Sequence, residues 1–475
     1  MHIKEKSIIF APKNKAMYIN RQIDADLSAW KNSPRRKPLL LRGARQVGKS
    51  SSIRHLASSF RYYIEVNFEK QPELSGIFDT ADVKDITTKL SQYFTTPIVE
   101  GETLLFLDEI QACPGALKSL WFFKEDMPGL HVAAAGSLLE FALKEIRSFG
   151  VGRIRSLFMY PLSFDEFLIA NGKASWVEAK KQASHDKPLF EALHSSLVNE
   201  FRKYLLVGGM PASVAAWIDT NDFSECAAEQ EDIQQSYYDD FPKYADKVPV
   251  KLLRDTLHSV VVQTGKKFVY RHVEGGHRPE DIQKALNLLC DAGIIKAVMH
   301  TAANGLPLGA ETNEKFCKYI YLDSGLLLRI FDLNLGGSKN LTDLILTGAA
   351  EDLVNKGAIT EMVAGWELVK YSSHKVQHSL FYWENLKNGT TSEVDYIIAK
   401  DLKVMPIEVK SGTSGKMKSL RLFMKSKHLT EAIRTSLENF GKLDINENTD
   451  DGSTVCRHIN ICPLYALSNI TEDSI

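Results

Sequence analysis

The chain has 475 residues, 44% of them hydrophobic and 25% charged, and its 58 Lys and Arg nearly balance its 59 Asp and Glu. This length suits about three domains, and the near-neutral charge excludes a polycation that coats nucleic acid over its whole surface. Six cysteines without a Cys-x-x-Cys pair argue against a zinc ribbon or a disulfide scaffold, and the lack of a signal-peptide pattern or a membrane-length apolar run predicts a cytoplasmic protein with no membrane partner.

The first strong signal is a glycine-rich octet that directly follows the apolar run 38–41. The octet fits the P-loop pattern of a glycine, four residues and Gly-Lys-Ser, and it stands between a predicted strand and a helix predicted over 51–58. The glycines let several N–H groups point at one phosphate chain, the lysine can reach the β- and γ-phosphates, and the serine hydroxyl can hold Mg²⁺. We therefore expect ATP or GTP to bind at Gly43, Ala44, Arg45, Gln46, Val47, Gly48, Lys49, Ser50 and Ser51.

Apolar runs predict further strands over 62–68, 103–107 and 131–137. The second run ends in Asp108 and Glu109, at the edge of a parallel sheet where ligands bind. We expect Asp108 to hold the water shell of Mg²⁺ and Glu109 to deprotonate the water that attacks the γ-phosphate. A solvated acidic turn is the alternative. Ser137 could sense the γ-phosphate, although Gly-Ser also ends strands as a plain turn.

Two arginines follow the third of these strands. Arg153 or Arg155 could neutralise the charge that develops during phosphoryl transfer, either in its own chain or in a neighbour within a homo-oligomer. A surface arginine or a salt bridge is the alternative for both.

Four strings together resemble a family of prokaryotic AAA+-type ATPases whose members join an AAA-like domain (AAA_14) to a C-terminal domain of unknown function, DUF4143. The resemblance covers most of the chain and implies ATP rather than GTP as the ligand, in predicted ATP-binding proteins with a poorly defined cellular role. The strings are the P-loop, Asp108-Glu109-Ile110-Gln111, Gly136-Ser137 and Pro161-Leu162-Ser163-Phe164-x-Glu166-Phe167.

The segment 171–249 shows helical periodicity around a turn signal, Gly208-Gly209-Met210-Pro211, which also matches the family. In AAA+ proteins a helical lid follows the sheet domain, so the resemblance implies a lid here. A plain helical bundle that packs on the core is the alternative.

The next segment predicts a helix over 278–290 and strands over 294–298 and 319–322, which is the outline of a winged helix. Arg278 and Lys284 are the helix's only cations, which is few for phosphate contacts. Contact with a protein therefore competes with direct reading of DNA. A string over 321–327 also resembles the same family.

A second chemical pattern lies on two strands predicted over 393–398 and 405–410. An Asp, followed on the next strand by Glu-x-Lys, resembles the PD-(D/E)XK nuclease core, in which carboxylates hold Mg²⁺ and a lysine orients water or neutralises charge. Cross-strand salt bridges on a solvated sheet face are the alternative. The resemblance implies an active site formed by Glu361, Asp395, Glu408 and Lys410. In this set, Asp395 and Glu408 would hold the metal.

A basic cluster follows this pattern and could hold a nucleic-acid backbone, although basic runs are more often solvated helix faces. Beyond residue 438 the chain is rich in Asn, Asp, Ser and Thr, which predicts a peripheral cap or a loose tail. The cluster comprises Lys416, Lys418, Arg421, Lys425 and Lys427.

We therefore expect an α/β protein made of an AAA+-like P-loop ATPase core with a parallel sheet over 1–170, a helical lid or linker over 171–249, a winged-helix-like domain over 250–335 and a PD-(D/E)XK nuclease-like DUF4143 domain over 336–475. The expected function is Mg²⁺-dependent ATP hydrolysis coupled to action on nucleic acid, with DNA as the partner. The alternative is a signalling or regulatory switch whose C-terminal domain binds DNA or protein without catalysis.

Overall fold

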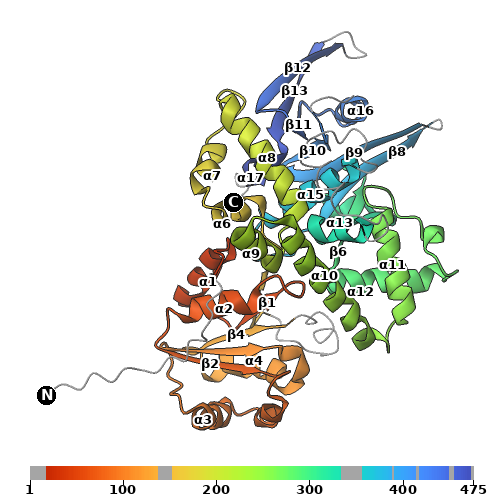
Figure 1. The fold of residues 1–475 in the computed structure, drawn as a ribbon. Coiled ribbons are helices and arrows are strands. Elements are labelled where there is room, and N and C mark those ends of the chain that lie inside the picture. Colours follow the sequence, from red (N-terminus) through yellow and green to blue (C-terminus); the bar gives the residue numbers. More distant parts are fainter. Residues whose placement is uncertain are drawn as a thin grey trace.

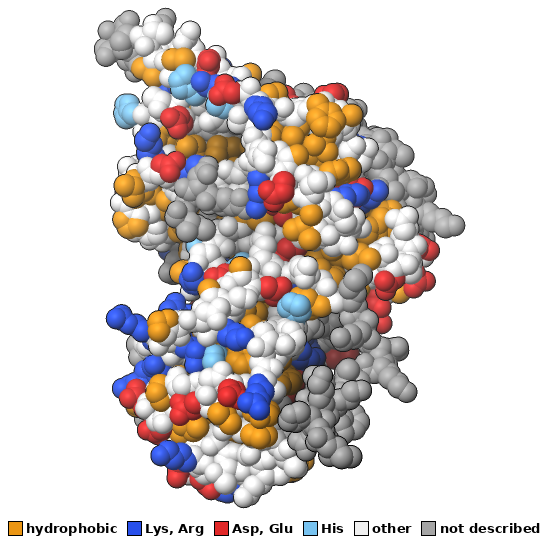
Figure 2. Space-filling model, turned by 90° about the vertical axis from the view of Figure 1, so that its left-hand side faces the viewer, with side chains coloured by type: hydrophobic (Ala, Val, Ile, Leu, Met, Phe, Trp, Pro, Cys, Tyr) orange, Lys and Arg blue, Asp and Glu red, His pale blue; other side chains and the backbone are white. Residues whose placement is uncertain are grey.

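The structure is a computed structural model that describes residues 18–136, 152–332, 356–387, 390–412, 417–448 and 454–471. It contains two sheets, one near each end of the molecule, and helices such as α9 and α10 lie between them (Figure 1). From another side the outline narrows between the two lobes, and Lys and Arg side chains gather on the lower, N-terminal lobe (Figure 2). None of the described helices is both long and apolar enough to cross a membrane.

The N-terminal sheet has five strands in the order β2-β3-β4-β1-β5, and all four neighbouring pairs are parallel. The carboxyl ends of its strands therefore meet at one edge, where the residues that follow β1 and β3 are separated by a single strand, β4. The predicted strands of this region are confirmed. The strands are β1 (Leu39–Arg42), β2 (Tyr62–Asn67), β3 (Thr103–Asp108), β4 (His131–Ala135) and β5 (Arg155–Phe158).

Helices cover both faces of this sheet because successive side chains of a strand point to opposite faces. Leu39 and Leu41 pack with residues of α1 and α2, whereas Leu40 packs with residues of α3 and α4. Each of these fully buried leucines contributes about 1.5–3 kcal/mol. The helices are α1 (Ile23–Asn32), α2 (Lys49–Ala57), α3 (Val83–Phe94) and α4 (Pro114–Asp126).

A helical segment follows, and the predicted helical character of 171–249 is confirmed. Its turn at Gly208 has a φ of 71°, and a Cβ there would lie 2.2 Å from a carboxylate oxygen of Asp323, so only glycine fits. Gly209 N–H donates to the same carboxylate at 2.6 Å, so two of the family-like strings contact each other. The helices are α6 (Phe164–Ala170), α7 (Ala174–Lys181), α8 (Glu191–Val207), α9 (Pro211–Thr220) and α10 (Phe223–Asp240).

The predicted winged-helix outline is present as helix, strand and strand. The hairpin formed by β6 and β7 is antiparallel, and α12 packs against α11 and β6. Lys284 on α12 is paired with Asp281 at 2.9 Å, which leaves it less available for phosphate. The elements are α11 (Val250–Val262), α12 (Pro279–Asp291), β6 (Ile295–Thr301), β7 (Thr312–Tyr321) and α13 (Ser324–Asp332).

The second sheet has eight strands in the order β12-β13-β11-β10-β9-β8-β6-β7. The boundary predicted at 335 runs through this sheet, because β6 pairs in parallel with β8. The remaining elements are α15 (Lys356–Lys370), β8 (Leu380–Lys387), β9 (Thr390–Lys400), β10 (Lys403–Val409), α16 (Lys418–Ser426), β11 (Glu431–Ser436), β12 (Gly441–Asn448), β13 (Thr454–Pro463) and α17 (Ser468–Thr471).

Of the peripheral cap and the loose tail expected beyond residue 438, the loose tail is wrong. Strand β13 lies inside the sheet, parallel to β11 on one side and antiparallel to β12 on the other. Ile459, Leu464 and Tyr465 are buried. The alternation of buried and exposed residues along β13 is not visible in the sequence, because one of its buried positions is the charged Arg457. Arg457 donates to backbone carbonyls and to Glu447.

Candidate functional site

The P-loop connects the end of β1 to the start of α2 at the carboxyl edge of the N-terminal sheet. Gly43 has a φ of 144°, and a Cβ there would lie 2.1 Å from the carbonyl oxygen of Met159, so only glycine fits at this position. Gly48 has a φ of 99° and begins α2, which directs the N-terminus of that helix at the loop.

Lys49 is buried and turned back onto its own loop. Its ammonium donates to the carbonyl oxygens of Gly43 at 2.9 Å and Ala44 at 2.7 Å. Burial lowers the pKa of Lys49 to about 8, while the carboxylates of Glu109 and Asp108 oppose the shift. A phosphate chain would provide the missing counter-charge.

Oxygen atoms that suit Mg²⁺ lie next to the loop. Ser50 Oγ donates to Asp108 Oδ1 at 2.9 Å, and Asn67 Nδ2 donates to the other oxygen of Asp108 at 3.1 Å. Burial raises the pKa of Asp108 although the Ser50 hydroxyl lowers it. A hydroxyl and a carboxylate are hard donors, so this pair fits the ion.

Glu109 stands in a left-handed conformation with a φ of 49° directly after β3. Its carboxylate accepts a hydrogen bond from Gln111 Nε2 at 2.7 Å. A non-glycine residue held in this region stores strain, which is common at functional sites. Gln111, the last residue of the Asp-Glu-Ile-Gln string, thus holds the side chain of Glu109, the second residue, in place.

Arg21 ties the segment before α1 to the P-loop. Its guanidinium donates to the carbonyl oxygens of Val47 at 2.9 Å and Tyr160 at 2.7 Å, and to Glu166 Oε1 at 3.0 Å. Glu166 also forms a capping box with Ser163 at the start of α6. The Pro-Leu-Ser-Phe-x-Glu-Phe string therefore supports the P-loop from behind.

Helix α10 holds the P-loop from the other side. Arg45 Nη1 contacts both carboxylate oxygens of Asp240, at 2.5 and 2.6 Å. Gln46 Nε2 donates to Ser236 Oγ at 2.6 Å, and the Tyr237 hydroxyl donates to the carbonyl oxygen of Arg45 at 2.8 Å. A conformational change in the P-loop would therefore alter its contacts with α10.

The structure separates the predicted arginines from the P-loop of their own chain. Arg155 pairs with Leu39 at the amino end of β1, whereas the P-loop follows the carboxyl end. Arg153 is paired with Glu125 at 2.8 Å and lies over the ring of Trp121. The prediction that either acts within its own chain does not fit this geometry, because the sheet lies between. Ser137 lies outside the described residues.

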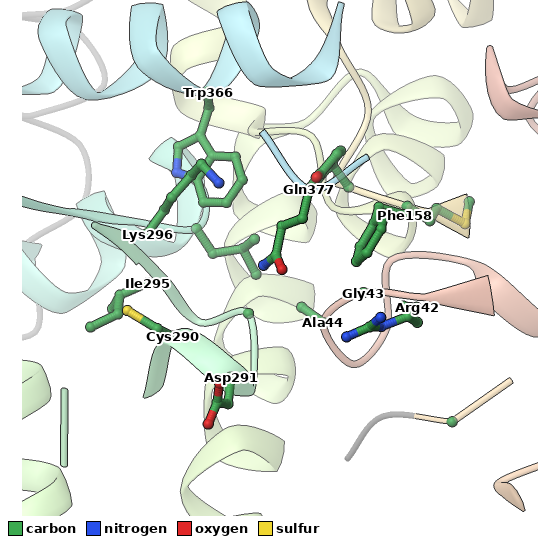
Figure 3. Close-up of a pocket in the computed structure, with 15 residues that line it drawn as sticks. Arg42, Gly43, Ala44, Phe158, Cys290, Asp291, Ile295, Lys296, Trp366 and Gln377 are labelled. Atoms are coloured by element: carbon green, nitrogen blue, oxygen red, sulfur yellow. The ribbon is translucent and has the colours of Figure 1, made fainter. Parts of the chain in front are cut away.

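A pocket opens between the P-loop and the C-terminal lobe. Gly43 and Ala44 form one wall, and Trp366 on α15 and Lys296 on β6 form the opposite wall, with Gln377 between them (Figure 3). The pocket shows that β6 and α15 face the P-loop directly.

Two of the carboxylates predicted in the C-terminal half, Glu361 and Asp395, lie close together, and they are joined by Glu393, which was not predicted. Oxygen atoms of Glu361 on α15 and of Glu393 and Asp395 on β9 lie within 4.8 Å of one another. Asp395 Oδ2 accepts from Val409 N–H at 2.7 Å, which places it against β10. Glu408 on β10 pairs with Lys410 at 2.5 Å.

A bulge in β9 produces this convergence. Phe381 of β8 faces Ile397 and Trp383 faces Val394, so β9 has one more residue than β8 over this stretch. Val394 and Ile397 consequently pack in the same hydrophobic cluster, although they are three residues apart. Asp395, which lies between them, reaches the cluster of carboxylates.

Glu361 and Glu408 are buried, whereas Glu393 and Asp395 are partly buried. Burial raises the pKa of Glu408 to about 7, with a further contribution from Asp395 and an opposing one from Lys410. Burial also raises the pKa of Glu361 and of Asp395. Hard oxygen donors at this spacing suit a divalent cation. The salt bridges of Lys318 with Glu361 and Glu393 also match the alternative of salt bridging, although Lys318 itself is buried.

Helix α15 joins the two candidate sites. Glu361 lies in its first half, and Glu367 and Lys370 lie in its last turns. Glu367 Oε2 accepts from Phe164 N–H at 2.9 Å, and Lys370 Nζ donates to the carbonyl oxygen of Leu162 at 3.0 Å. One helix thus contacts the string beside the P-loop and the carboxylate cluster.

The predicted basic cluster lies on and beside α16. The helix buries Leu420, Phe423 and Met424, so its cations point outward. Arg421 is paired with Glu447 at 2.8 Å, and Lys427 donates to Asn304 Oδ1 at 2.5 Å. Lys416 lies outside the described residues, whereas Lys418 and Lys425 are exposed.

Sequence reasoning missed several members of the two sites. Glu393 had a signal, because it stands two residues before Asp395 on the same strand. Lys318, whose ammonium contacts Glu361 at 2.8 Å, had only the weaker signal of a lysine that continues an apolar strand. Arg21 and Asp240 had none, because their partners are more than 140 residues away.

Family models match three consecutive parts of the chain. They are an AAA domain over residues 35–168, a domain of unknown function (DUF8612) over 198–336 and a domain of unknown function (DUF4143) over 356–460. The chain therefore contains an AAA domain followed by a C-terminal DUF4143 domain, as the resemblance of its sequence implied. The middle match spans the boundary predicted at 249.

Solved structures with low similarity include two archaeal proteins. The ORC1 protein of Aeropyrum pernix, in complex with DNA, is 11% identical with a TM-score of 0.30, over 72% of this chain and 97% of that one. A signal transduction ATPase with numerous domains and a tetratricopeptide repeat sensor, from Pyrococcus horikoshii, is 13% identical with a TM-score of 0.25, over 76% of this chain and 53% of that one. The chain thus spans about half the length of the second protein. Comparison with curated proteins gave no match.

Proposed function

We propose that this protein binds and hydrolyses ATP at the P-loop and couples the reaction to the cleavage of DNA at the C-terminal carboxylate cluster. The first half rests on the proximity of Lys49, Ser50 and Asp108 at the carboxyl edge of the parallel sheet. Lys49 would exchange its bonds to loop carbonyls for bonds to the β- and γ-phosphates. Mg²⁺ bound at Ser50 and Asp108 would neutralise phosphate charge.

Hydrolysis would depend on Glu109. Its carboxylate would accept the proton of the attacking water while Gln111 keeps the side chain in place. Asn67 would keep Asp108 oriented. An arginine such as Arg153 could contribute only to the site of a neighbouring copy.

The single observation that carries the coupling is the double attachment of α15. Its last turns are bonded to Leu162 and Phe164 of the AAA domain, and Glu361 of the same helix belongs to the carboxylate cluster. A movement of the P-loop support would therefore shift Glu361 relative to Asp395. Lys410, bonded to Glu408, would orient water or stabilise the charge on a scissile phosphate.

DNA cleavage tests the second half of the proposal. Supercoiled and linear DNA are incubated with Mg²⁺ or Mn²⁺, with and without ATP, and the products are separated on gels. Wild type should cut, Lys410→Ala should not, and Lys403→Ala should cut like wild type because Lys403 is an exposed lysine on the same strand. Equal behaviour of wild type and Lys410→Ala would refute cleavage.

Steady-state ATP hydrolysis with and without DNA tests the coupling. We expect DNA to increase the rate. If no nucleic acid changes it, the regulatory switch with a non-catalytic C-terminal domain becomes the better description.

A further inference from the structure

A buried lysine lies among the carboxylates of the C-terminal cluster. The side chain of Lys318, on β7, is 1% exposed, and its ammonium contacts Glu361 Oε1 at 2.8 Å and Glu393 Oε1 at 2.5 Å. Oxygens of these two residues and of Asp395 lie within 4.8 Å of one another. The ammonium therefore stands where a cation bound by these carboxylates would stand.

The other half of the cluster has unused acceptor capacity. Glu408 is 5% exposed, and its Oε2 has no hydrogen-bond partner among the residues that the structure describes. Its other oxygen contacts Lys410, and Asp395 beside it accepts one backbone N–H. A buried carboxylate oxygen without a donor is costly unless a cation approaches it.

We propose that Lys318 is the permanent counter-ion of the Glu361–Glu393 half and limits the cluster to one divalent cation, held by Asp395 and Glu408. The inference rests on the proposed metal-dependent function of the cluster. Lys318 belongs to the segment matched by DUF8612, whereas the carboxylates belong to the DUF4143 match. The site is therefore completed across two family domains, and the position of β7 sets how many ions the carboxylates can hold.

Binding of Mn²⁺, measured by titration calorimetry and by electron paramagnetic resonance without nucleotide, tests the proposal. All proteins carry Ser50→Ala, which removes the hydroxyl that is proposed to hold metal at the P-loop. We expect one Mn²⁺ per chain, and Glu408→Gln should weaken its binding by at least about tenfold. Glu361→Gln should change the Kd by less than about threefold, because Lys318 already occupies that carboxylate.

Replacing the lysine should create a second ion site. Lys318→Met should bind two Mn²⁺ per chain, whereas Lys318→Arg keeps the positive charge and should bind one. Lys318→Met also removes the ion-pair partner of the buried Glu361 and the partly buried Glu393, so its melting temperature should fall and then recover with Mn²⁺ but not with Na⁺.

Two results would overturn the proposal. One is a Glu361→Gln variant that loses Mn²⁺ binding as completely as Glu408→Gln does. This result does not depend on whether Lys318→Met folds. The other is a folded Lys318→Met variant with the ion number and affinity of wild type. If wild type binds no Mn²⁺ at the cluster, the proposed cleavage function fails, and a gain of one ion in Lys318→Met still supports Lys318 as counter-ion.

Discussion

The two candidate sites of this protein are built in different ways. The P-loop site uses consecutive residues, and Asp108 and Glu109 are brought to it because β3 ends at the same edge of the parallel sheet as β1, with only β4 between them. The carboxylate cluster takes its members from β7, α15, β9 and β10 and needs a bulge to aim Asp395. A site made of consecutive residues, such as the P-loop, can be predicted from a short sequence motif. In a site assembled from distant segments, such as the carboxylate cluster, a motif can point to some of the acids but not to a distant cation such as Lys318.

The largest expected effect concerns the local site. Glu109→Gln should lower the rate of ATP hydrolysis by about 10²–10⁴-fold, because it removes the general base. The Kd for ATP should change little, because the carboxylate is expected to act on water. Steady-state hydrolysis and equilibrium binding measure the two quantities. Glu102→Gln, at an exposed glutamate paired with Arg61, is the control. Normal ATP hydrolysis by Glu109→Gln would show that Glu109 is not the general base.

The next effect concerns long-range support of the P-loop. Glu166→Gln should reduce the free energy of unfolding by about 3–5 kcal/mol at pH 7, because it leaves Arg21 buried without its partner. Asp85→Asn, at an exposed ion pair, should cost less than about 1 kcal/mol. Chemical denaturation measures both. Similar losses in the two variants would show that the loop needs no distant partner.

The same pair gives a pH dependence. Burial raises the pKa of Glu166, but Arg21 and two backbone N–H groups lower it by more, so the folded-state pKa lies below the ordinary value of 4.5. Its contribution to stability is therefore complete above the unfolded-state pKa and is lost as pH falls through the folded-state pKa. The difference between wild type and Glu166→Gln should shrink below about pH 4.5. A constant difference down to pH 2 would contradict the ion pair.

A smaller effect is expected where α10 meets the P-loop. Asp240→Asn should tighten ATP binding by about 3–10-fold, because Arg45 no longer has to exchange a carboxylate for phosphate. Asp239→Asn alters the neighbouring exposed carboxylate and should have no effect. Isothermal titration with ATP and Mg²⁺ compares them. Weaker binding in Asp240→Asn would mean that the contact organises the loop and does not compete with ATP.

The smallest effect should come from the residue that orients Asp108. Asn67→Ala should lower kcat for ATP hydrolysis by about 3–10-fold and leave KM nearly unchanged. Steady-state kinetics over a range of ATP concentrations separates the two parameters. A change in KM alone would place Asn67 in nucleotide binding.

Much of the fold could be predicted because local pattern dominates it. Runs of buried leucine, alanine and valine predicted the parallel strands, and glycine spacing predicted the loop. The bulge at Asp395 and the insertion of β13 between two strands could not be predicted, because sheet register depends on partners far along the chain.

The candidate sites follow the same rule. Lys49, Ser50 and Asp108 could be named from motifs, whereas Asp240 and Lys318 are defined only by what folding brings to them. Nothing in a local window distinguishes Asp240 from an ordinary surface charge, and Lys318 has only the weak signal of a lysine beside an apolar strand. The motifs therefore named candidate acids and bases such as Asp108 and Glu408, but they missed Glu393 and the charged partners that folding brings to the two sites.

Equilibrium binding of fluorescent ATP with Mg²⁺ tests the central claim most directly, namely that this P-loop holds a nucleoside triphosphate. Wild type should bind it, Lys49→Ala should bind at least about 100-fold more weakly, and Lys89→Ala, at an exposed lysine of the same domain, should match wild type. A wild-type chain that retains no ATP, or a Lys49→Ala chain that retains it equally well, would contradict the account.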